Sequence, residues 1–362
     1  MKKVLSLVLV LIFAVTFVAG CGSNSTSQSS TETSTAASTE STATSTTASN
    51  SESNGDTVKT GLAVISSIAK STDAGEKDGL AEVDSMIAAV TVDKDGKIVK
   101  CVVDAAQTKV NFSKEGKLLT DLKTEFKSKQ ELKTEYGMQK ASKIGKEWNE
   151  QADAFAKYVI GKTADEVKGI SVNAEGVAGD AELASSVTVH IGDFIAVVEK
   201  AVKNAQDLGA KAGDKLGLGV STNIAKSADV GEKDGVAQAY SNYTATTFAA
   251  DGKITSCVID ASQSNVNFNK EGKITSDLKA PLQDKIELGE NYGLKKASKI
   301  GKEWFEQAAA LAKYVTGKTV DQVKGIAVSA EGVPTDAELT SSVTIHIADY
   351  TAVIEKAAAN AK

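Results

Sequence analysis

The sequence predicts an α+β protein built from two tandem copies of one domain, each an antiparallel sheet with packed helices. Residues recur at a constant offset of 156, as in Gly61 and Gly217 or Trp148 and Trp304, and this period is too long for a solenoid unit. Each copy begins with strand-like segments joined by a tight turn, and continues into segments whose apolar residues recur at helical spacing. These three observations together indicate the α+β class.

Residues 1–20 are typical of a signal peptide. Lys2 and Lys3 precede an apolar core that ends in Val18-Ala19-Gly20-Cys21, the pattern of a bacterial lipobox. A transmembrane anchor is the alternative, but the apolar run is short and Cys21 follows it directly. We therefore expect Cys21 to be lipidated and to hold the protein in membrane lipid, on the extracytoplasmic face of the cell membrane.

Residues 21–57 comprise this cysteine and a Ser/Thr-rich stretch with almost nothing apolar to bury, which predicts a disordered tether. The predicted domains are then residues 58–209 and 210–362. The formal net charge of −6 makes nucleic acid a poor partner. Every basic residue is a lysine, so the chain has no guanidinium clamp for a phosphate.

The first elements of each copy are predicted to form a hairpin. In the first copy, residues 83–92 and 97–104 are strand-like, and the segment 93–96 (DKDG) is a good hairpin turn. A calcium loop is the alternative, but the second copy lacks one of its carboxylates and later ligands are missing. Cys101 and Cys257 recur at one strand position, and we expect them to be buried small hydrophobes because each domain has a single cysteine.

Helices are predicted for the rest of each copy. Residues 141–161 carry one apolar stripe, formed by Ile144, Trp148, Ala152, Phe155 and Val159. Gly161 and Gly317 are candidate C-caps. Thr163 and Thr319 open capping boxes with Glu166 and Gln322. A last amphipathic helix follows, with Asp193 and Asp349 as its predicted N-caps.

The segment before that last helix contains the candidate site. Residues 187–191 (VTVHI) alternate, so an extended strand would place Thr188 and His190 together on one face, close to a helix N-terminus that suits an anion. Thr344 and His346 repeat this arrangement. A half-exposed strand whose polar side happens to be Thr and His is the alternative interpretation.

The order of hairpin, helices and an acid-x-x-S-x-x-T motif before an amphipathic helix resembles the FMN-binding domain of flavinylated bacterial electron carriers. In that family a D-x-x-S-G-A-T motif carries FMN as a phosphoester on its threonine, attached by a dedicated flavin transferase. The resemblance implies FMN on Thr188 and Thr344, up to two per chain, with the neighbouring motif positions and histidines as cofactor-binding candidates: Glu182, Ser185, His190, Glu338, Ser341 and His346. The motif departs from the family in both copies, with Glu for Asp, Ser for Gly and Val for Ala.

The layout is similar to that of surface lipoproteins of Gram-positive extracellular electron transfer. The resemblance implies a redox carrier, not a substrate-specific enzyme, that takes electrons from a membrane NADH dehydrogenase and quinone pool. It would pass them to extracellular acceptors such as ferric iron or free flavins. A cofactor-free surface module for binding or structure is the second hypothesis. A hydrolase ranks third, because no nucleophile motif is present, and a metal site is not expected with one histidine per domain.

Overall fold

The computed structural model describes residues 56–362. The predicted signal peptide, the lipidation site at Cys21 and all but the last two residues of the predicted tether lie outside the described residues. Within 56–362 the chain is a mixed α+β structure with two three-stranded antiparallel sheets and packed helices. None of the helices in this range is long and apolar enough to cross a membrane.

The first repeat opens with a three-stranded meander, in which β2 pairs with both neighbours. The strands are β1 (Lys59–Ser67), β2 (Gly79–Val92) and β3 (Ile98–Phe112). Short helices follow: α1 (Lys129–Leu132), η1 (Lys133–Tyr136), α2 (Trp148–Tyr158), α3 (Ala164–Lys168), α4 (Ala181–Ala184) and α5 (Gly192–Lys203). The predicted turn at 93–96 is confirmed, with Gly96 at φ 77° and Asp93 Oδ1 accepting the Lys97 N–H at 2.8 Å.

The second repeat has the same order of elements. Its strands are β4 (Lys215–Asn223), β5 (Gly235–Phe248) and β6 (Ile254–Phe268). Its helices are α6 (Lys285–Leu288), η2 (Gly289–Tyr292), η3 (Leu294–Lys296), α7 (Trp304–Val315), α8 (Val320–Lys324), α9 (Ala337–Thr340) and α10 (Ala348–Asn360). Both predicted capping boxes are confirmed, because Thr163 and Thr319 accept the N–H groups of Glu166 and Gln322.

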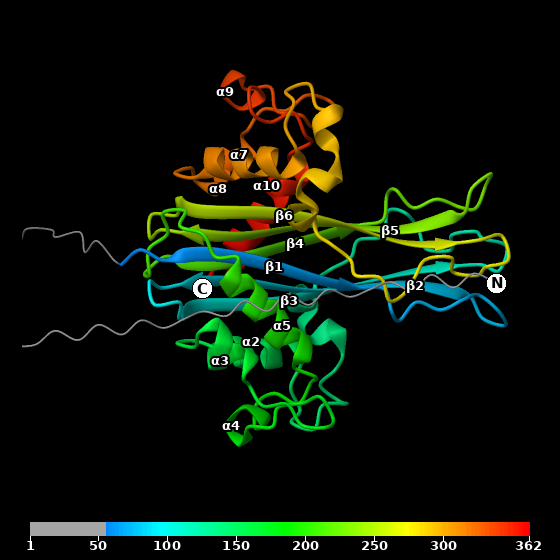
Figure 1. Cartoon of the computed structure of the whole chain (residues 1–362), viewed down its shortest axis with the longest axis horizontal. Coiled ribbons are helices and arrows are strands. Elements are labelled where there is room, and N and C mark those ends of the chain that lie inside the picture. Colours follow the sequence, from blue (N-terminus) through cyan, green and yellow to red (C-terminus); the bar gives the residue numbers. More distant parts are fainter. Residues whose placement is uncertain (1–55) are drawn as a thin grey trace, which may run out of the picture. The chain divides into compact units, whose positions relative to one another are not determined.

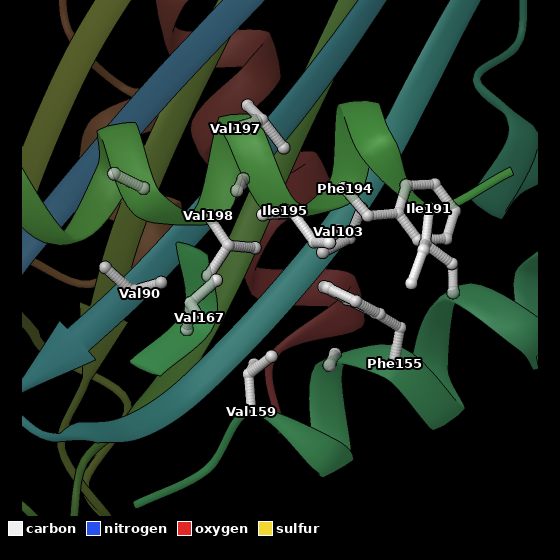
Figure 2. Close-up of a cluster of buried hydrophobic side chains, with 14 of the residues drawn as sticks. Val90, Val103, Phe155, Val159, Val167, Ile191, Phe194, Ile195, Val197 and Val198 are labelled. Atoms are coloured by element: carbon white, nitrogen blue, oxygen red, sulfur yellow. The ribbon is translucent and has the colours of Figure 1, made fainter. Parts of the chain in front are cut away.

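The helices of each repeat cover one face of its own sheet. In the first repeat α5 packs on β1 and β2, and α2 packs on β3. Figure 2 shows the resulting core, in which the Phe155 ring of α2 meets the Phe194 ring of α5 with centroids 5.2 Å apart. Gly61 permits the close approach of α5, since a Cβ there would overlap the carbonyl oxygen of Ala201.

The other faces of the two sheets pack against each other. One shared core contains Leu62 and Ile87 from the first repeat with Leu218 and Tyr243 from the second. In another, the rings of Phe112 and Phe268 stack with centroids 4.2 Å apart and an interplanar angle of 9°. The result is four layers, with the helices of the two repeats on opposite sides of the paired sheets (Figure 1).

The contacts between repeats come in symmetric pairs. Asp73 Oδ1 accepts the Ile274 N–H at 2.8 Å, and Asp229 Oδ1 accepts the Leu118 N–H at 2.8 Å. Two ion pairs follow the same rule, Lys200 with Glu287 and Lys356 with Glu131, each at 2.7 Å. Because all four pairs are related by the 156-residue offset, the two repeats are joined by an approximate twofold axis.

Several predicted boundaries differ from the structure. The β2–β3 hairpin extends beyond the predicted strands, to residues 79–92 and 98–112. The predicted helix at 141–161 begins only at Trp148, where Glu147 forms a capping box with Glu150, so Ile144 precedes the helix. The predicted N-caps were wrong, because Ile191 and Ile347 occupy the N-cap positions and Asp193 and Asp349 lie in the first helical turns.

Candidate functional site

Thr188 and Thr344 lie in the irregular segments that connect α4 to α5 and α9 to α10. The predicted strand at 187–191 does not form, because Val187 and Ile191 are buried as anchors of a loop and no partner strand is present among the described residues. Both threonines are half-buried, and the histidines two residues later are exposed. Each threonine is therefore reachable while its backbone is fixed on both sides by buried aliphatic residues.

A buried glutamine holds each threonine, from α2 in the first repeat and from α7 in the second. Gln307 Oε1 accepts the Thr344 backbone N–H at 2.8 Å and the Thr344 hydroxyl at 3.1 Å. Gln151 does the same for Thr188 at 2.7 and 3.2 Å. Both glutamines are 0% exposed, and the amide nitrogen of Gln307 donates to Ser298 Oγ at 3.2 Å. The hydroxyl proton thus points inward, which leaves the oxygen lone pairs free on the outer side.

These glutamines were not predicted from the sequence. The available signal was a polar residue, Gln151 or Gln307, beside the apolar stripe of the helix that begins at Trp148 or Trp304. A polar side chain that is buried at such a position needs hydrogen-bond partners. The recurrence of glutamine at the same point in both copies would have predicted a structural partner elsewhere in each repeat.

The acidic and serine positions of the motif contribute to the local turn. Ser185 Oγ donates to the Glu182 carbonyl oxygen at 2.7 Å, and Ser341 Oγ donates to the Glu338 carbonyl oxygen at 3.0 Å. The side chains of Glu182 and Glu338 are exposed. The two glutamates belong to the short helices α4 and α9, and the two serines are the C-caps of these helices. The serine hydroxyls therefore form their hydrogen bonds within these turns and not with the threonines.

The histidines pack over glycine turns. A Cβ on Gly176 would contact the His190 ring, and a Cβ on Gly332 would overlap the His346 ring. Both glycines have positive φ, 79° and 72°, which other residues rarely adopt. The Ile347 N–H donates to the Gly332 carbonyl oxygen at 2.9 Å, which fixes the end of the irregular segment before α10.

In the second repeat, residues 344–346 form one wall of a cavity of about 640 Å³. Thr344 and His346 line it, and aromatic side chains from four other elements form much of the remainder: Tyr240, Tyr292, Trp304 and Tyr350. The aromatic rings are fixed by their own hydrogen bonds, since Trp304 Nε1 donates to Tyr350 Oη at 3.0 Å. A cavity of this size, with several aromatic side chains beside polar and charged ones, is large enough for a small molecule.

Lys285 lies at the inner end of this cavity and is 2% exposed. Its Nζ is 4.5–5.0 Å from the ring centroids of Tyr240, Tyr292 and Trp304, and it donates to Tyr240 Oη at 2.8 Å. Burial lowers the pKa of the amine to about 7, and the Asp260 carboxyl opposes this shift. Burial also raises the pKa of Tyr292 to about 12, so its phenol stays protonated.

Two buried aspartates position the lysines of both repeats. Asp260 Oδ1 accepts the Ile286 N–H at 3.2 Å, and Asp104 Oδ1 accepts the equivalent Gln130 N–H at 3.0 Å. Each aspartate therefore fixes the first turn of α6 or α1, in which Lys285 or Lys129 stands. Burial raises the pKa of Asp104 to about 6, and it also raises that of Asp260, with Asp284 adding to the effect.

The corresponding region of the first repeat keeps part of this arrangement. Lys129 Nζ lies 4.7 Å from the Tyr136 ring centroid and 5.3 Å from that of Trp148. The positions of Tyr240 and Tyr350 are occupied by Asp84 and Phe194. Asp84 pairs with Lys70 at 2.7 Å. The two regions thus share the threonine, glutamine, lysine and tryptophan but differ beside the lysine.

Cys101 and Cys257, the cysteines in the part of the chain that the structure describes, are free thiols, and neither lies in a threonine segment. Cys257 is buried and Cys101 half-buried. Among residues 56–362, no group of three His, Cys, Asp or Glu side chains could hold a metal ion. No protein-family model, curated protein or solved structure matches this chain.

Proposed function

We propose that the chain is an electron carrier at the cell surface that holds FMN as a phosphoester on Thr344 and Thr188. The observation that carries the proposal is that Thr344 lines the same cavity as four aromatic side chains and two lysines. A flavin ring is planar and aromatic, and it stacks or packs edge-on against such rings. The chain does not have to supply redox chemistry, because the bound flavin would supply one- and two-electron transfer.

The threonine hydroxyl is arranged for modification on its outer side. Gln307 Oε1 accepts the hydroxyl proton at 3.1 Å, so the lone pairs of Thr344 Oγ1 face away from the protein core. Ester formation would join Oγ1 to phosphorus and release the hydroxyl proton, while a phosphoanhydride bond of an activated flavin donor breaks. A flavin transferase is the partner that this step requires, because the flavin donor has to be bound and aligned with Thr344 Oγ1.

The charges near Thr344 suit a phosphate held by a covalent bond. Asp349 lies in the first turn of α10 and works against an anion at that helix N-terminus. Lys226 and Lys285 line the same cavity and supply positive charge. A phosphate bound by these lysines alone would lack the two-point contact that a guanidinium provides, and the chain has no arginine. An ester link removes the need for such a contact.

The proposed donors and acceptors follow from the resemblance and the predicted lipid anchor. A membrane NADH dehydrogenase and quinone pool would reduce the carrier, and ferric iron or free flavins outside the cell would oxidise it. The segments around α4 and α9 lie on opposite outer sides of the paired sheets (Figure 1), so each site would meet partners from its own side.

Co-expression with a flavin transferase tests the proposal. Intact mass and flavin absorbance should show up to two FMN esters on the wild-type protein. Thr188→Val and Thr344→Val should each remove one equivalent and leave the other. Thr351→Val is the matched control, because its hydroxyl only donates to the Ala348 carbonyl oxygen within α10, at 2.8 Å. It should keep the full load.

A wild-type protein without flavin in the presence of an active transferase would overturn the proposal. The cofactor-free surface module would then be the better account of the cavity. A full load of two flavins in either threonine variant would show a different attachment point, and peptide mapping of the labelled protein would locate it.

A further inference from the structure

The two candidate sites differ most in the surroundings of one lysine. Lys285 is 2% exposed and faces three aromatic rings, whereas its counterpart Lys129 is half-buried and faces two. The third ring is that of Tyr240, which also accepts a hydrogen bond from Lys285 Nζ at 2.8 Å. The first repeat has Asp84 at that position.

The exchange of Tyr240 for Asp84 changes the charge beside the site. In the first repeat the Asp84 carboxylate pairs with Lys70 at 2.7 Å and compensates it. In the second repeat Lys226 occupies the position of Lys70 and lines the cavity, and residue 240 is a neutral phenol. The second site therefore has one carboxylate fewer at this position, and its lysines are free to act on a ligand.

Other charged groups around Lys285 do not reverse this difference. Asp260 has the counterpart Asp104, and His346 and Asp349 have the counterparts His190 and Asp193, so these groups are common to both sites. Asp284 replaces Ser128 as a helix cap, and its carboxylate shares Lys200 of the first repeat, 3.3 Å away, with Glu287. Burial raises the pKa of Asp284, which favours its neutral form and weakens its opposing charge. Tyr292 and Tyr350 add no charge, because burial raises the pKa of both phenols.

From these contacts we infer that Lys285 is the positioning and counter-charge residue of the second site, and that flavin on Thr344 has the higher reduction potential of the two. The inference rests on the proposed function. Reduction adds negative charge to a flavin, and a cation in a poorly solvated pocket stabilises that charge more strongly than one in water. Tyr240, Tyr292 and Trp304 fix the amine in place, so no reorganisation is needed when the charge arrives.

Single-site proteins provide the test. Thr188→Val leaves flavin on Thr344 only, and Thr344→Val leaves it on Thr188 only. Spectroelectrochemical titration should give the Thr344 flavin the higher midpoint, by at least tenfold in the equilibrium constant, which is about 30 mV for a two-electron couple. Adding Lys285→Met to the Thr188→Val protein should remove most of that difference. Lys279→Met, on an exposed lysine, is the control and should leave the midpoint unchanged.

A reciprocal pair of substitutions tests the inference even if the Lys285→Met protein does not fold. Tyr240→Asp in the Thr188→Val protein should lower the midpoint, and Asp84→Tyr in the Thr344→Val protein should raise it. Equal midpoints in the two single-site proteins, with full flavin load by mass, would overturn the inference and leave the proposed function intact. Absence of flavin from both single-site proteins, when the transferase is active, would overturn the proposed function together with the inference.

Discussion

From the burial of Lys285 we predict how the stability of the protein depends on pH, and this prediction can be tested without a bound cofactor. Because burial lowers the pKa of its amine from 10.5 to about 7, the folded protein must hold a desolvated ammonium or release a proton at any pH below 10.5. This cost is complete below pH 7 and disappears above pH 10.5. The Lys285→Met variant has no titrating group at this position, so the wild type should gain stability relative to the variant as the pH rises from 7 towards 10.5.

The magnitude follows from the size of the shift. Each pKa unit corresponds to about 1.4 kcal/mol, so the full cost of the shift is on the order of 5 kcal/mol, and the part that is relieved between pH 6 and pH 9 is about 3 kcal/mol. The three ring faces favour the ammonium by roughly 0.5–2 kcal/mol in total, which reduces the change. We therefore expect the difference in free energy of unfolding between variant and wild type to shrink by about 1–3 kcal/mol over this range.

Urea unfolding at pH 6, 7, 8 and 9 would measure this difference, with Lys129→Met as the control. Lys129 occupies the same position in the first repeat, but its side chain is half-buried, so its variant should show a much weaker dependence on pH. A Lys285→Met difference that stays constant from pH 6 to pH 9 would refute the reasoning, because it would mean that the amine keeps its solvation in the folded state.

Four further variants test the packing that supports the site. Gln307→Leu leaves the N–H and hydroxyl of the bound threonine unpaired and should lower the free energy of unfolding by about 2–3 kcal/mol in urea; an unchanged midpoint would show that water replaces the amide. Phe112→Ala should cost about 3–5 kcal/mol, with a similar loss for Phe268→Ala, because the rings stack on each other at the sheet interface; a negligible cost in either variant would count against the shared core. Gly217→Ala places a Cβ on the Ala357 carbonyl oxygen and should lower the thermal midpoint by several degrees, the result of about 1–3 kcal/mol of strain; a wild-type midpoint would mean that α10 can move outward freely.

Short-range features of the fold could be predicted from the sequence. The hairpin turn at 93–96 and the capping boxes at Thr163 and Thr319 depend on side chains within four residues of each other, so the local pattern contains the whole cause. The helix start at Trp148 was missed because Ile144 continues the apolar spacing. Glu147 interrupts it by capping the helix with Glu150, and its carboxylate also accepts the Met138 N–H at 2.9 Å.

Long-range features could not be predicted in this way. The strand predicted at 97–104 runs on to Phe112, past Asp104, whose carboxylate is buried in the sheet. The buried carboxylate is stabilised by hydrogen bonds, since it accepts the N–H groups of Ala105 and Gln130. The shared core between the repeats cannot be predicted from the sequence of either copy alone. The strands of one copy show only that its sheet has a second apolar face, and they do not show that this face packs against the sheet of the other copy.

This arrangement explains how the two sites could diverge while the fold stayed symmetric. The contacts that join the repeats, such as Phe112 with Phe268 and Asp73 with Ile274, lie on the inner sheet faces and at the ends of the hairpins. Position 240 and its counterpart 84 belong instead to the side of each sheet that faces the threonine segments. A change from carboxylate to phenol there alters neither the stacked rings nor the paired hydrogen bonds between repeats. The contacts between the repeats, which both copies share, are therefore separate from the two outer surfaces. The charge beside Lys285 can change without loss of these contacts.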